Sequence, residues 1–496
     1  MESNEIIKKE IDDVMQKAWT AFSIYKNFSL NRRKAFLYAI ADELENAGDE
    51  LIITCMEETN LPESRLKNEK GRTIFQLRSY ADYCESGEWL DARIDTAVPD
   101  RTPPKPDIRK MNVPLGPVVV FGPSNFPLAY STGGGDTASA LAAGCPVIVK
   151  AHPGHLKTSE IVAQLIHKAA EKMNMPEGIF SHISFTSNYA GEVLVKHPNT
   201  KAVGFTGSVS VGTLLFRWGN ERKNPIPVFA EMGSVNPVFL MPGKINESPD
   251  GIAKMYAASI TLGAGQFCTN PGIIIGLGGN DLNRFMLSLG EEIRKIAPAK
   301  MLHENIARSF MNQRDNILKE KGVTVVAVSE LEKSEFSGIP TIATVSSEEF
   351  LRNPKLHEEI FGPYSLVVQC KSLDEFTSIA SLMEGQLTCT MMATNDDMRS
   401  HPVLIEEIKA ICGRFIINGV PTGVEVCMSM QHGGPFPATT DGRFTSVGGD
   451  AIKRFVRPLA FQNWPEELLP DELKNENPLE IFRTVNNNLT KGRIDK

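Results

Sequence analysis

The pattern of hydrophobic and polar positions changes along the chain. Apolar residues recur at helical spacing over residues 31–45 and again over residues 158–173. Thr158 or Ser159 is expected to cap the second helix, and Gly178 follows its end. Beyond residue 113, short β-branched runs alternate with helical stretches, which predicts a doubly wound parallel sheet. Its expected strands are Val118–Phe121, Val147–Val149, Ala202–Phe205 and Val228–Ala230.

A second α/β unit is expected from about residue 242 to residue 427. Residues 90–112 contain four prolines, which favour extended chain and oppose helix. We therefore expect this segment to leave the main core as a hairpin. Residues 464–496 are rich in Pro, Asn, Glu and Lys and are expected to wrap a surface of this or another subunit. Strands of the second unit are expected at residues 273–275, 324–328, 365–368 and 415–417.

Composition narrows the classes of function. The chain has 496 residues, 42% of them hydrophobic, which is enough for two or three domains. The net charge is -8 and no block of Lys and Arg interrupts it, so a nucleic-acid partner is not expected. We find neither a signal-peptide pattern nor an apolar run long enough for a membrane, and we expect a cytoplasmic protein. Eight cysteines without a C-x-x-C pair argue against a zinc site and a disulfide framework.

Two residues lie in local sequence contexts that suit covalent catalysis. Cys268 lies in the segment Gly265–Thr269, whose small residues let a substrate approach the sulfur. A thiolate is a strong nucleophile when its pKa is lowered or a base assists it. Glu231 stands where a predicted strand ends before a glycine turn, and strand carboxyl ends face the ligand crevice of open α/β sheets. Taken alone, the cysteine also fits a buried apolar position and the glutamate a solvated loop.

Polar groups follow two further predicted strands. Asn125 comes after the strand Val118–Phe121 and could donate to a developing oxyanion, or support its own turn. Lys150 ends the next strand and could hydrogen-bond a ribose or a phosphate, or remain an unpaired surface lysine. His152 and His155 follow it closely.

A glycine turn also follows the strand that ends at Phe205. The chain turns at Gly207, and a helix containing Gly212 is expected to begin at about Ser208. Free amides at such a helix start can hold a pyrophosphate. The segment lacks the G-x-G-x-x-G pattern, so a simple turn between strand and helix fits it equally well.

Taken together and in this order, the segments resemble the aldehyde dehydrogenase superfamily from about residue 10 to residue 465. Glu231-Met-Gly is similar to the glutamate motif of that family, and Gly265–Thr269 to its cysteine motif. Glu358–Pro363 resembles the segment that binds the nicotinamide ribose, and Gly413–Gly419 the strand that follows. The resemblance implies NAD(P)-dependent oxidation of an aldehyde to a carboxylic acid.

The resemblance also implies a role for each residue. Cys268 would attack the aldehyde carbon, while Asn125 and the Cys268 amide would hold the oxyanion. Glu231 would activate the water that hydrolyses the resulting thioester. This account requires the sulfur to be ionised at the mouth of a crevice near Asn125 and Glu231. No metal is expected, and coenzyme contacts are expected from Lys150, His152, His155, Gly207, Ser208, Gly212, Glu359 and Phe361.

Two departures from the family pattern refine the expectation. Many NAD-specific members carry Glu three residues after the lysine, but Pro153 stands there in this chain, so NADP is expected, with NAD as the alternative. The usual P-F-G-G segment is replaced by His432–Gly448. With Arg454–Gln462 and Ser131–Ala140, this replacement resembles the α-ketoglutaric semialdehyde (2,5-dioxopentanoate) dehydrogenase branch. The implied product is 2-oxoglutarate, and Arg443 is one candidate for holding the anionic substrate.

Other functions stay open at this point. A broad-specificity or long-chain fatty aldehyde dehydrogenase is the alternative within the superfamily. A binding or structural protein that has kept only the fold has no need of Cys268, Glu231 and Asn125 together. Relatives that form acyl-CoA or reduce acyl phosphates usually lack the glutamate, so Glu231 favours release of the free acid.

The resemblance implies a division into three parts. Residues 1–89 and 113–241 would form a Rossmann-type cofactor-binding domain, and residues 242–450 an α/β catalytic domain. Residues 90–112 and 451–496 would form a small β oligomerisation arm. Because Arg454–Gln462 could extend the sheet of a neighbouring subunit, a homodimer or homotetramer is expected.

Overall fold

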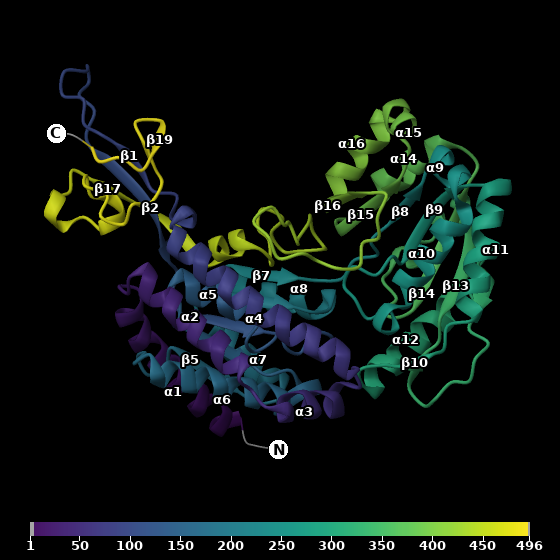
Figure 1. Ribbon diagram of the computed structural model, residues 1–496, viewed down its shortest axis with the longest axis horizontal. Helices are drawn as coiled ribbons and strands as arrows, with labels where there is room; N and C mark the ends of the chain where they lie inside the picture. Colours follow the sequence, from purple (N-terminus) through teal and green to yellow (C-terminus); the bar gives the residue numbers. More distant parts are fainter. Residues whose placement is uncertain (1–3, 495–496) are drawn as a thin grey trace.

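The computed structural model describes residues 4–494. They form two α/β domains, with a β-rich arm that projects away from both (Figure 1). The outermost residues of the expected domain limits, 1–3 and 495–496, lie outside the described residues. Among the described helices, none has both the length and the apolar character that crossing a bilayer requires.

The first domain is built on a parallel sheet with strand order β5-β4-β3-β6-β7. Successive residues of β3 enter two different cores, Val118 and Val120 on one face and Val119 and Phe121 on the other. A parallel sheet covered on both faces reads as such a continuous apolar run. The strand order reverses between β3 and β6, which places a ligand crevice at their carboxyl ends. The strands are β3 (Val118–Phe121), β4 (Val147–Lys150), β5 (Phe180–Ile183), β6 (Ala202–Thr206) and β7 (Val228–Glu231).

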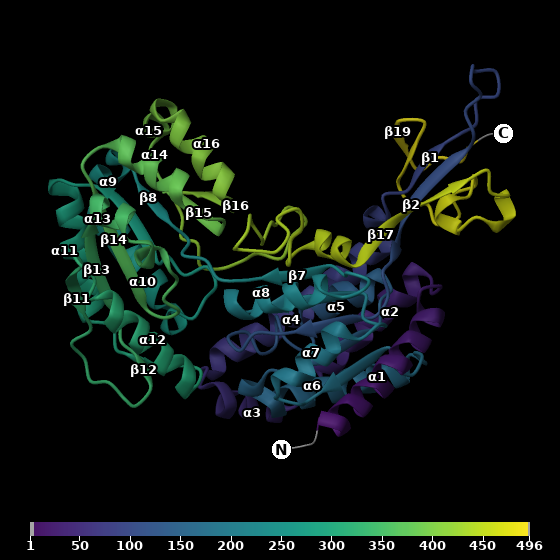
Figure 2. The same ribbon diagram turned by 180° about the vertical axis from the view of Figure 1, so that it is seen from behind.

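Helices cover both faces of this sheet. Five of them share one core and three share the other, and Figure 2 shows the domain from behind. The first group is α2 (Leu30–Glu45), α3 (Asp49–Thr59), α4 (Glu63–Ser86), α5 (Gly135–Ala143) and α6 (Leu156–Lys172). The second group is α1 (Asn4–Tyr25), α7 (Asn188–Lys196) and α8 (Val209–Asn220).

The start of α6 differs from the expectation. His155 precedes the helix, and neither Thr158 nor Ser159 caps it, because a 3-10 turn over Pro153–His155 leads into the first helical turn. The amide of Thr158 is instead satisfied by the carboxylate of Glu58 on α3. The cap is thus supplied by a distant part of the chain, which local sequence could not indicate.

The second domain is built on a seven-stranded sheet with order β11-β13-β14-β9-β8-β15-β16. All neighbouring pairs are parallel except β11 with β13. Its strands are β8 (Val238–Leu240), β9 (Ile273–Leu277), β11 (Thr324–Val328), β13 (Thr341–Ser346), β14 (Tyr364–Cys370), β15 (Gln386–Met392) and β16 (Cys412–Ile417). Its helices are α9 (Pro242–Glu247), α10 (Pro249–Thr261), α11 (Asn280–Arg294), α12 (Glu304–Ile317), α13 (Ser347–Arg352), α14 (Leu373–Leu382), α15 (Asn395–Ser400) and α16 (Pro402–Ile411). A separate two-stranded ribbon joins β10 (Ala299–Lys300) to β12 (Ser337–Gly338).

Two segments differ from the expected domain limits. β8, expected in the first domain, pairs with β9 and β15 of the second, so the chain crosses over before residue 238. Thr439 and Thr440, expected in the catalytic domain, bond to β7 of the first domain instead. Thr439 forms a β-bridge with Glu231, and the amide of Thr440 donates to the carbonyl of Ala230. The free edge of β7 offers backbone partners that a passing segment can use.

The arm is a five-stranded sheet with order β17-β2-β1-β18-β19. The expected hairpin is the antiparallel pair of β1 and β2. β17 pairs antiparallel with β2 along its whole length and forms one edge of the sheet. The strands are β1 (Arg93–Asp95), β2 (Ile108–Pro114), β17 (Val456–Gln462), β18 (Arg483–Val485) and β19 (Asn488–Thr490).

Candidate active site

A cavity of about 840 Å³ lies between the two α/β domains. Residues at the carboxyl ends of β3, β4, β6 and β7 line it from one side, and the start of α12 lines it from the other. This is the crevice that the reversal of strand order predicts. Most of the expected site residues line it, namely Asn125, Lys150, His152, Gly207, Ser208, Glu231, Cys268, Glu359 and Phe361.

Two expected coenzyme residues do not line the cavity. His155 is fully buried, and its Nε2 atom lies 3.0 Å from the carbonyl oxygen of Pro123. Its ring stacks on that of His152 at a centroid distance of 5.3 Å. Gly212 lies inside α8, where a Cβ atom would come within 2.5 Å of the sulfur of Met232. Both residues therefore lie behind the cavity wall, and the expected contacts with coenzyme stay a prediction for them.

The loop that carries Cys268 is fixed by side-chain amides. Asn236 Nδ2 donates to the carbonyl of Cys268 at 2.9 Å, and Asn270 Nδ2 donates to the carbonyl of Gly362 at 3.2 Å. Gly265 has a φ of 65°, and a Cβ there would lie 2.3 Å from the Gly362 carbonyl. A glycine is needed at this close approach, so the small residue noted in the sequence serves packing as well as access.

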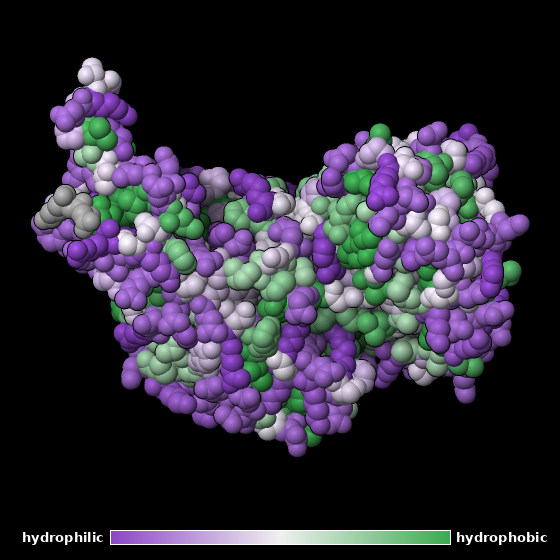
Figure 3. Space-filling model, turned by 45° about the horizontal axis from the view of Figure 1, so that its top comes forward, coloured by the Kyte–Doolittle hydropathy of each residue, from purple (hydrophilic) through white to green (hydrophobic). Residues whose placement is uncertain are grey.

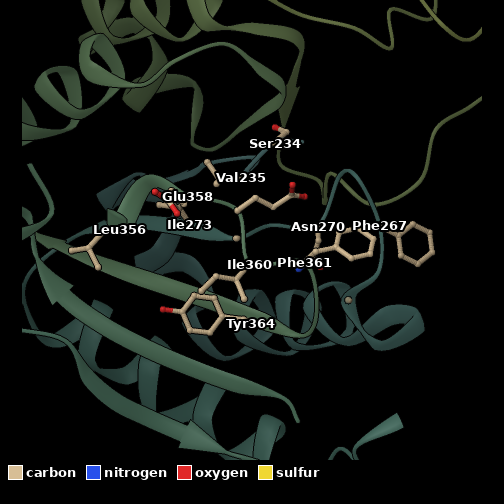
Figure 4. Close-up of a pocket in the computed structure, with 13 residues that line it drawn as sticks. Ser234, Val235, Phe267, Asn270, Ile273, Leu356, Glu358, Ile360, Phe361 and Tyr364 are labelled. Atoms are coloured by element: carbon tan, nitrogen blue, oxygen red, sulfur yellow. The ribbon is translucent and has the colours of Figure 1, made fainter. Parts of the chain in front are cut away.

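The segment that carries Glu359 packs against this loop around a small cavity (Figure 4). Figure 4 shows Phe267 and Asn270 of the loop close to Ile360 and Phe361 of the segment. Burial raises the pKa of Glu359 to about 8. A carboxyl group that keeps its proton near neutral pH can donate as well as accept, which suits contact with a ribose hydroxyl.

Three ionisable side chains meet at the inner end of the crevice. Cys268 Sγ lies 3.7 Å from His432 Nε2, and that nitrogen lies 3.0 Å from Glu231 Oε1. Ser446 Oγ donates to the other carboxylate oxygen of Glu231 at 2.5 Å. The sulfur, nitrogen and oxygen atoms all lie within 4.8 Å of one another, which is also close enough to hold a metal ion. The expectation that the protein uses no metal stays a prediction.

The cluster shifts the pKa values of the Glu231 carboxyl group and the Cys268 thiol in opposite directions. Burial works to raise the pKa of Glu231, but the contact with His432 Nε2 and the hydrogen bond from Ser446 outweigh it, so the pKa lies below its usual value. Burial, with the negative charges of Glu231 and Glu359, raises the pKa of Cys268 well above its usual value. The arrangement therefore favours a neutral thiol at rest over the expected thiolate, because a second anion beside a buried carboxylate is unfavourable. A base must remove the thiol proton during reaction.

Asn125 is held where an oxyanion would form. Its side chain is buried, and Nδ2 donates to the carbonyl of Gln266 at 3.1 Å, two residues before the nucleophile. Arg65 fixes its backbone by donating to the Asn125 carbonyl at 2.8 Å. An amide nitrogen carries two hydrogens, so one remains for a substrate oxygen.

The outer end of the crevice presents donors that lack protein partners. Ser208 caps α8 by accepting from the amide of Val211, which leaves earlier amides of the first turn for a ligand. Lys150 has no hydrogen-bond or ion-pair partner in the described part of the chain, and burial lowers its pKa. Burial also lowers the pKa of His152 to about 3, so its ring is neutral. This set of donors, with Glu359 at the other end, fits an elongated dinucleotide.

Sequence reasoning missed the roles of His432 and Ser446. Both lie in the segment that departs from the family pattern, so the departure itself was the available signal. Arg443, considered there for the substrate anion, is 81% exposed at its side chain and pairs with Asp441. It does not line the cavity.

Comparison with known proteins identifies the family. The model of the aldehyde dehydrogenase family matches residues 2–448. The chain belongs to the aldehyde dehydrogenase family. Aldehyde oxidation, predicted from the ordered motifs, is thereby confirmed. The family uses NAD(P), as expected.

Relatives and solved structures agree with this assignment. This aldehyde dehydrogenase is 46% identical over 475 residues to alpha-ketoglutaric semialdehyde dehydrogenase 2 of Azospirillum brasilense, covering 96% of this chain and 90% of that protein. It is 44% identical over 487 residues to the alpha-ketoglutaric semialdehyde dehydrogenase of Acinetobacter baylyi, covering 97% and 92%. A mutant of the Thermus thermophilus 1-pyrroline-5-carboxylate dehydrogenase has a TM-score of 0.79 at 20% identity, covering 92% of this chain and 86% of that one. The structural likeness confirms the α/β fold.

Proposed function

We propose that this aldehyde dehydrogenase oxidises 2,5-dioxopentanoate to 2-oxoglutarate through a thioester on Cys268. The observation that carries the chemistry is the meeting of the Cys268 thiol, the Glu231 carboxylate and the Asn125 amide along one cavity. Hydride is a poor leaving group unless an adjacent oxyanion expels it, so a nucleophile and an oxyanion donor are both required. All three groups have the chemistry that this reaction needs.

The residues divide the reaction into two stages. Glu231 takes the thiol proton, the sulfur bonds to the aldehyde carbon, and the carbonyl electron pair moves to oxygen, where Asn125 donates. A bound NAD(P)+ supplies the hydride acceptor, and a thioester on Cys268 results. After releasing the first proton to solvent, Glu231 takes a proton from water as its oxygen attacks the thioester carbon. The oxyanion electron pair then reforms the carbonyl as the carbon–sulfur bond breaks, the acid leaves, and the proton on Glu231 passes to the sulfur and restores the thiol.

Positive charge near the nucleophile supports an anionic aldehyde. Arg72 donates to the hydroxyl of Tyr130 at 3.2 Å, and Tyr130 lines the cavity. Burial lowers the pKa of Arg414, whereas negative charge on Cys268 or Tyr130 raises it, so its guanidinium lies within electrostatic reach of the sulfur. Guanidinium groups are suited to carboxylates. The two relatives named for α-ketoglutaric semialdehyde support the same substrate.

For the coenzyme we propose a preference for NADP. Pro153 stands where many NAD-specific relatives carry a glutamate that would repel a 2′-phosphate. Lys150 and His152 line this end of the cavity and offer donors to such a phosphate. NAD remains the alternative coenzyme.

A spectrophotometric screen tests substrate and coenzyme together. We would measure kcat/KM for 2,5-dioxopentanoate, glutaraldehyde and a fatty aldehyde, each with NADP and with NAD. The expected ranking places 2,5-dioxopentanoate first by about tenfold or more, since the uncharged aldehydes offer no carboxylate to the guanidinium groups near the cavity. Higher kcat/KM for the fatty aldehyde would replace this substrate with the long-chain function. A large preference for NAD would overturn the coenzyme proposal.

The covalent route is tested by Cys268→Ala. The variant should form no NADPH from aldehyde, because no other group takes over the attack. Product analysis in the wild-type enzyme should give the free acid even when coenzyme A is added. Survival of NADPH formation in the variant would leave the thioester route without support. We also propose a cytoplasmic location, where thiols stay reduced.

We further propose that subunits associate through edge strands. In the described part of the chain, β17 ends the arm sheet and β16 ends the catalytic sheet, each with one free edge. Leu459 on β17 is 36% exposed and Ile417 on β16 is 43% exposed. Figure 3 shows hydrophobic residues around the hollow between the arm and the catalytic domain. Pairing of β17 with β16 of a second subunit would cover both edges.

Light scattering measures this association directly. The wild-type chain should have the mass of a dimer or tetramer, and Ile417→Lys should shift it toward the monomer because it buries a charge in the contact. Lys409→Ala, on the exposed face of α16, serves as the matched control. An Ile417→Lys variant with unchanged mass would count against the contact.

A further inference from the structure

His432 occupies the space between the nucleophile and the base. Its side chain is 0% exposed, and its Nε2 atom contacts both Cys268 Sγ, at 3.7 Å, and Glu231 Oε1, at 3.0 Å. The backbone around it is pinned, since the His432 amide donates to Thr445 Oγ1 and the Ser446 amide donates to the His432 carbonyl. One ring nitrogen is therefore held at a fixed place beside two groups that exchange a proton.

The surroundings of the ring indicate which nitrogen carries hydrogen. An ionised carboxylate can only accept, so the short contact with Glu231 requires a hydrogen on Nε2. Nδ1 is buried and has no hydrogen-bond partner among the described residues. A doubly protonated ring would bury an unpaired N–H, which costs more than an unused lone pair on Nδ1. The neutral ring with hydrogen on Nε2 satisfies both conditions.

We propose that His432 is a third catalytic group, whose Nε2–H donates to whichever of Glu231 and Cys268 carries the negative charge. In the resting site the charge is on the Glu231 carboxylate. When the thiol proton moves to Glu231, the charge moves to the sulfur and Nε2–H can bond to the thiolate instead. The imidazole stays neutral, and the pair carries one negative charge before and after the transfer. This inference rests on the proposed thioester route and adds the group that makes its first proton transfer accessible.

The burial of the cluster explains why such a donor is needed. Cys268 and Glu231 lie close enough together that each disfavours the negative charge of the other. Ser446 donates a hydrogen bond to the carboxylate, and the Cys268 amide favours a negative charge on the sulfur, but neither of these donors serves both atoms. A donor that serves both atoms reduces the energy difference between the two protonation states. His432 is the group within reach of both.

Alkylation of the thiol tests the proposal without aldehyde or coenzyme. We would measure the rate of carbamidomethylation of Cys268 by iodoacetamide from pH 6 to pH 10, resolved by peptide mass spectrometry. His432→Phe keeps a ring and removes the donor, whereas His432→Gln keeps an N–H. The Phe variant should react about tenfold or more slowly at pH 7.5, with its pH midpoint about one unit higher, because a hydrogen bond to an anion is lost. The Gln variant should recover most of the rate.

Exposed Cys427 serves as an internal standard in the same samples. If the Phe variant matched the wild type in rate and midpoint, or if Phe and Gln slowed Cys268 equally with Cys427 unchanged, the donor role would be wrong. Should the Phe variant not fold, long-range proton–nitrogen spectra of the wild-type rings decide the matter, with assignment by His432→Gln. A neutral ring with hydrogen on Nε2 is expected at pH 7.5, and hydrogen on Nδ1 would overturn the proposal. An incorrect substrate assignment leaves all these readings intact, so the two failures are distinguishable.

Discussion

The two ends of the crevice differ in how far their polar groups already have protein partners. At the inner end, Cys268, Glu231 and His432 already contact one another, and His432 and Ser446 contact the two oxygens of the Glu231 carboxylate. At the outer end, Lys150 and the first amides of α8 after Ser208 have no partner among residues 4–494. The reacting end is thus organised before any ligand arrives, whereas the outer end gains its hydrogen bonds on binding. Mutations at the inner end should reduce chemistry, and mutations at the outer end should weaken binding.

The largest effect should follow removal of the base. Glu231→Gln should lower the steady rate by roughly 10²- to 10⁴-fold, because the thioester loses its water-activating group. The initial burst of NADPH should slow at neutral pH and recover at high pH, where hydroxide can take the thiol proton. Stopped-flow absorbance at 340 nm, a wavelength set by the reduced nicotinamide, separates the two phases. Equal steady rates in variant and wild type would remove Glu231 from the mechanism.

The second-largest effect on activity should follow removal of the oxyanion donor. Asn125→Ala should lower kcat by roughly 10²- to 10³-fold through loss of one preorganised hydrogen bond. The KM for coenzyme should hardly change, since the affected bond belongs to the inner end. Asn125→Asp is the matched control and should be at least as slow, because it places a negative charge beside the oxyanion. Steady-state kinetics at saturating coenzyme measures the difference.

A smaller effect is expected at the outer end. Lys150→Met should raise the KM for NADP by about tenfold while kcat stays within a factor of about two, because a charge-assisted hydrogen bond to ribose or phosphate is lost. Isothermal titration of NADP into the free enzyme gives the same ratio as a change in Kd. A drop in kcat with unchanged KM would contradict the division between the two ends.

The last prediction concerns the stability of the fold at the nicotinamide side rather than activity. Glu359 has a pKa of about 8 in the folded protein against an ordinary value of 4.5. Between these values the unfolded chain loses the proton first, so rising pH destabilises the fold. Glu359→Gln should remove this loss and stabilise the free enzyme by a few kcal/mol at pH 9, and by less than about 1 kcal/mol at pH 5. Denaturant unfolding at the two pH values measures it, and a gain independent of pH would point to packing instead.

Much of the fold could be predicted from the periodicity of apolar residues. This worked only for elements in which the buried residues are apolar and the exposed residues are polar. The all-apolar run of β3 was visible, whereas β15 was not, although every residue in Gln386–Met392 is buried. Thr388 is accommodated there because its hydroxyl donates to the Asn236 side chain, a contact 152 residues away. Polar residues satisfied by distant partners hide a strand from local patterns.

The candidate site shows the same limit. Cys268, Glu231 and Asn125 could be proposed from the sequence because each lies in a motif that is continuous in sequence. The raised pKa of the Cys268 thiol could not be predicted from the sequence, because it arises from burial and from groups that the fold brings together. The contact of Cys268 with His432 spans 164 residues and therefore has no local signature.

The pairing of β7 with the segment around Thr439 also has a consequence for synthesis of the chain on the ribosome. Glu231 is made early, but the residues that stabilise its charge, His432 and Ser446, emerge more than 200 codons later. A nascent first domain must therefore keep this carboxylate solvated or protonated until the last segment docks. The catalytic cluster is thus completed late in folding, after the strands of both sheets have been synthesised.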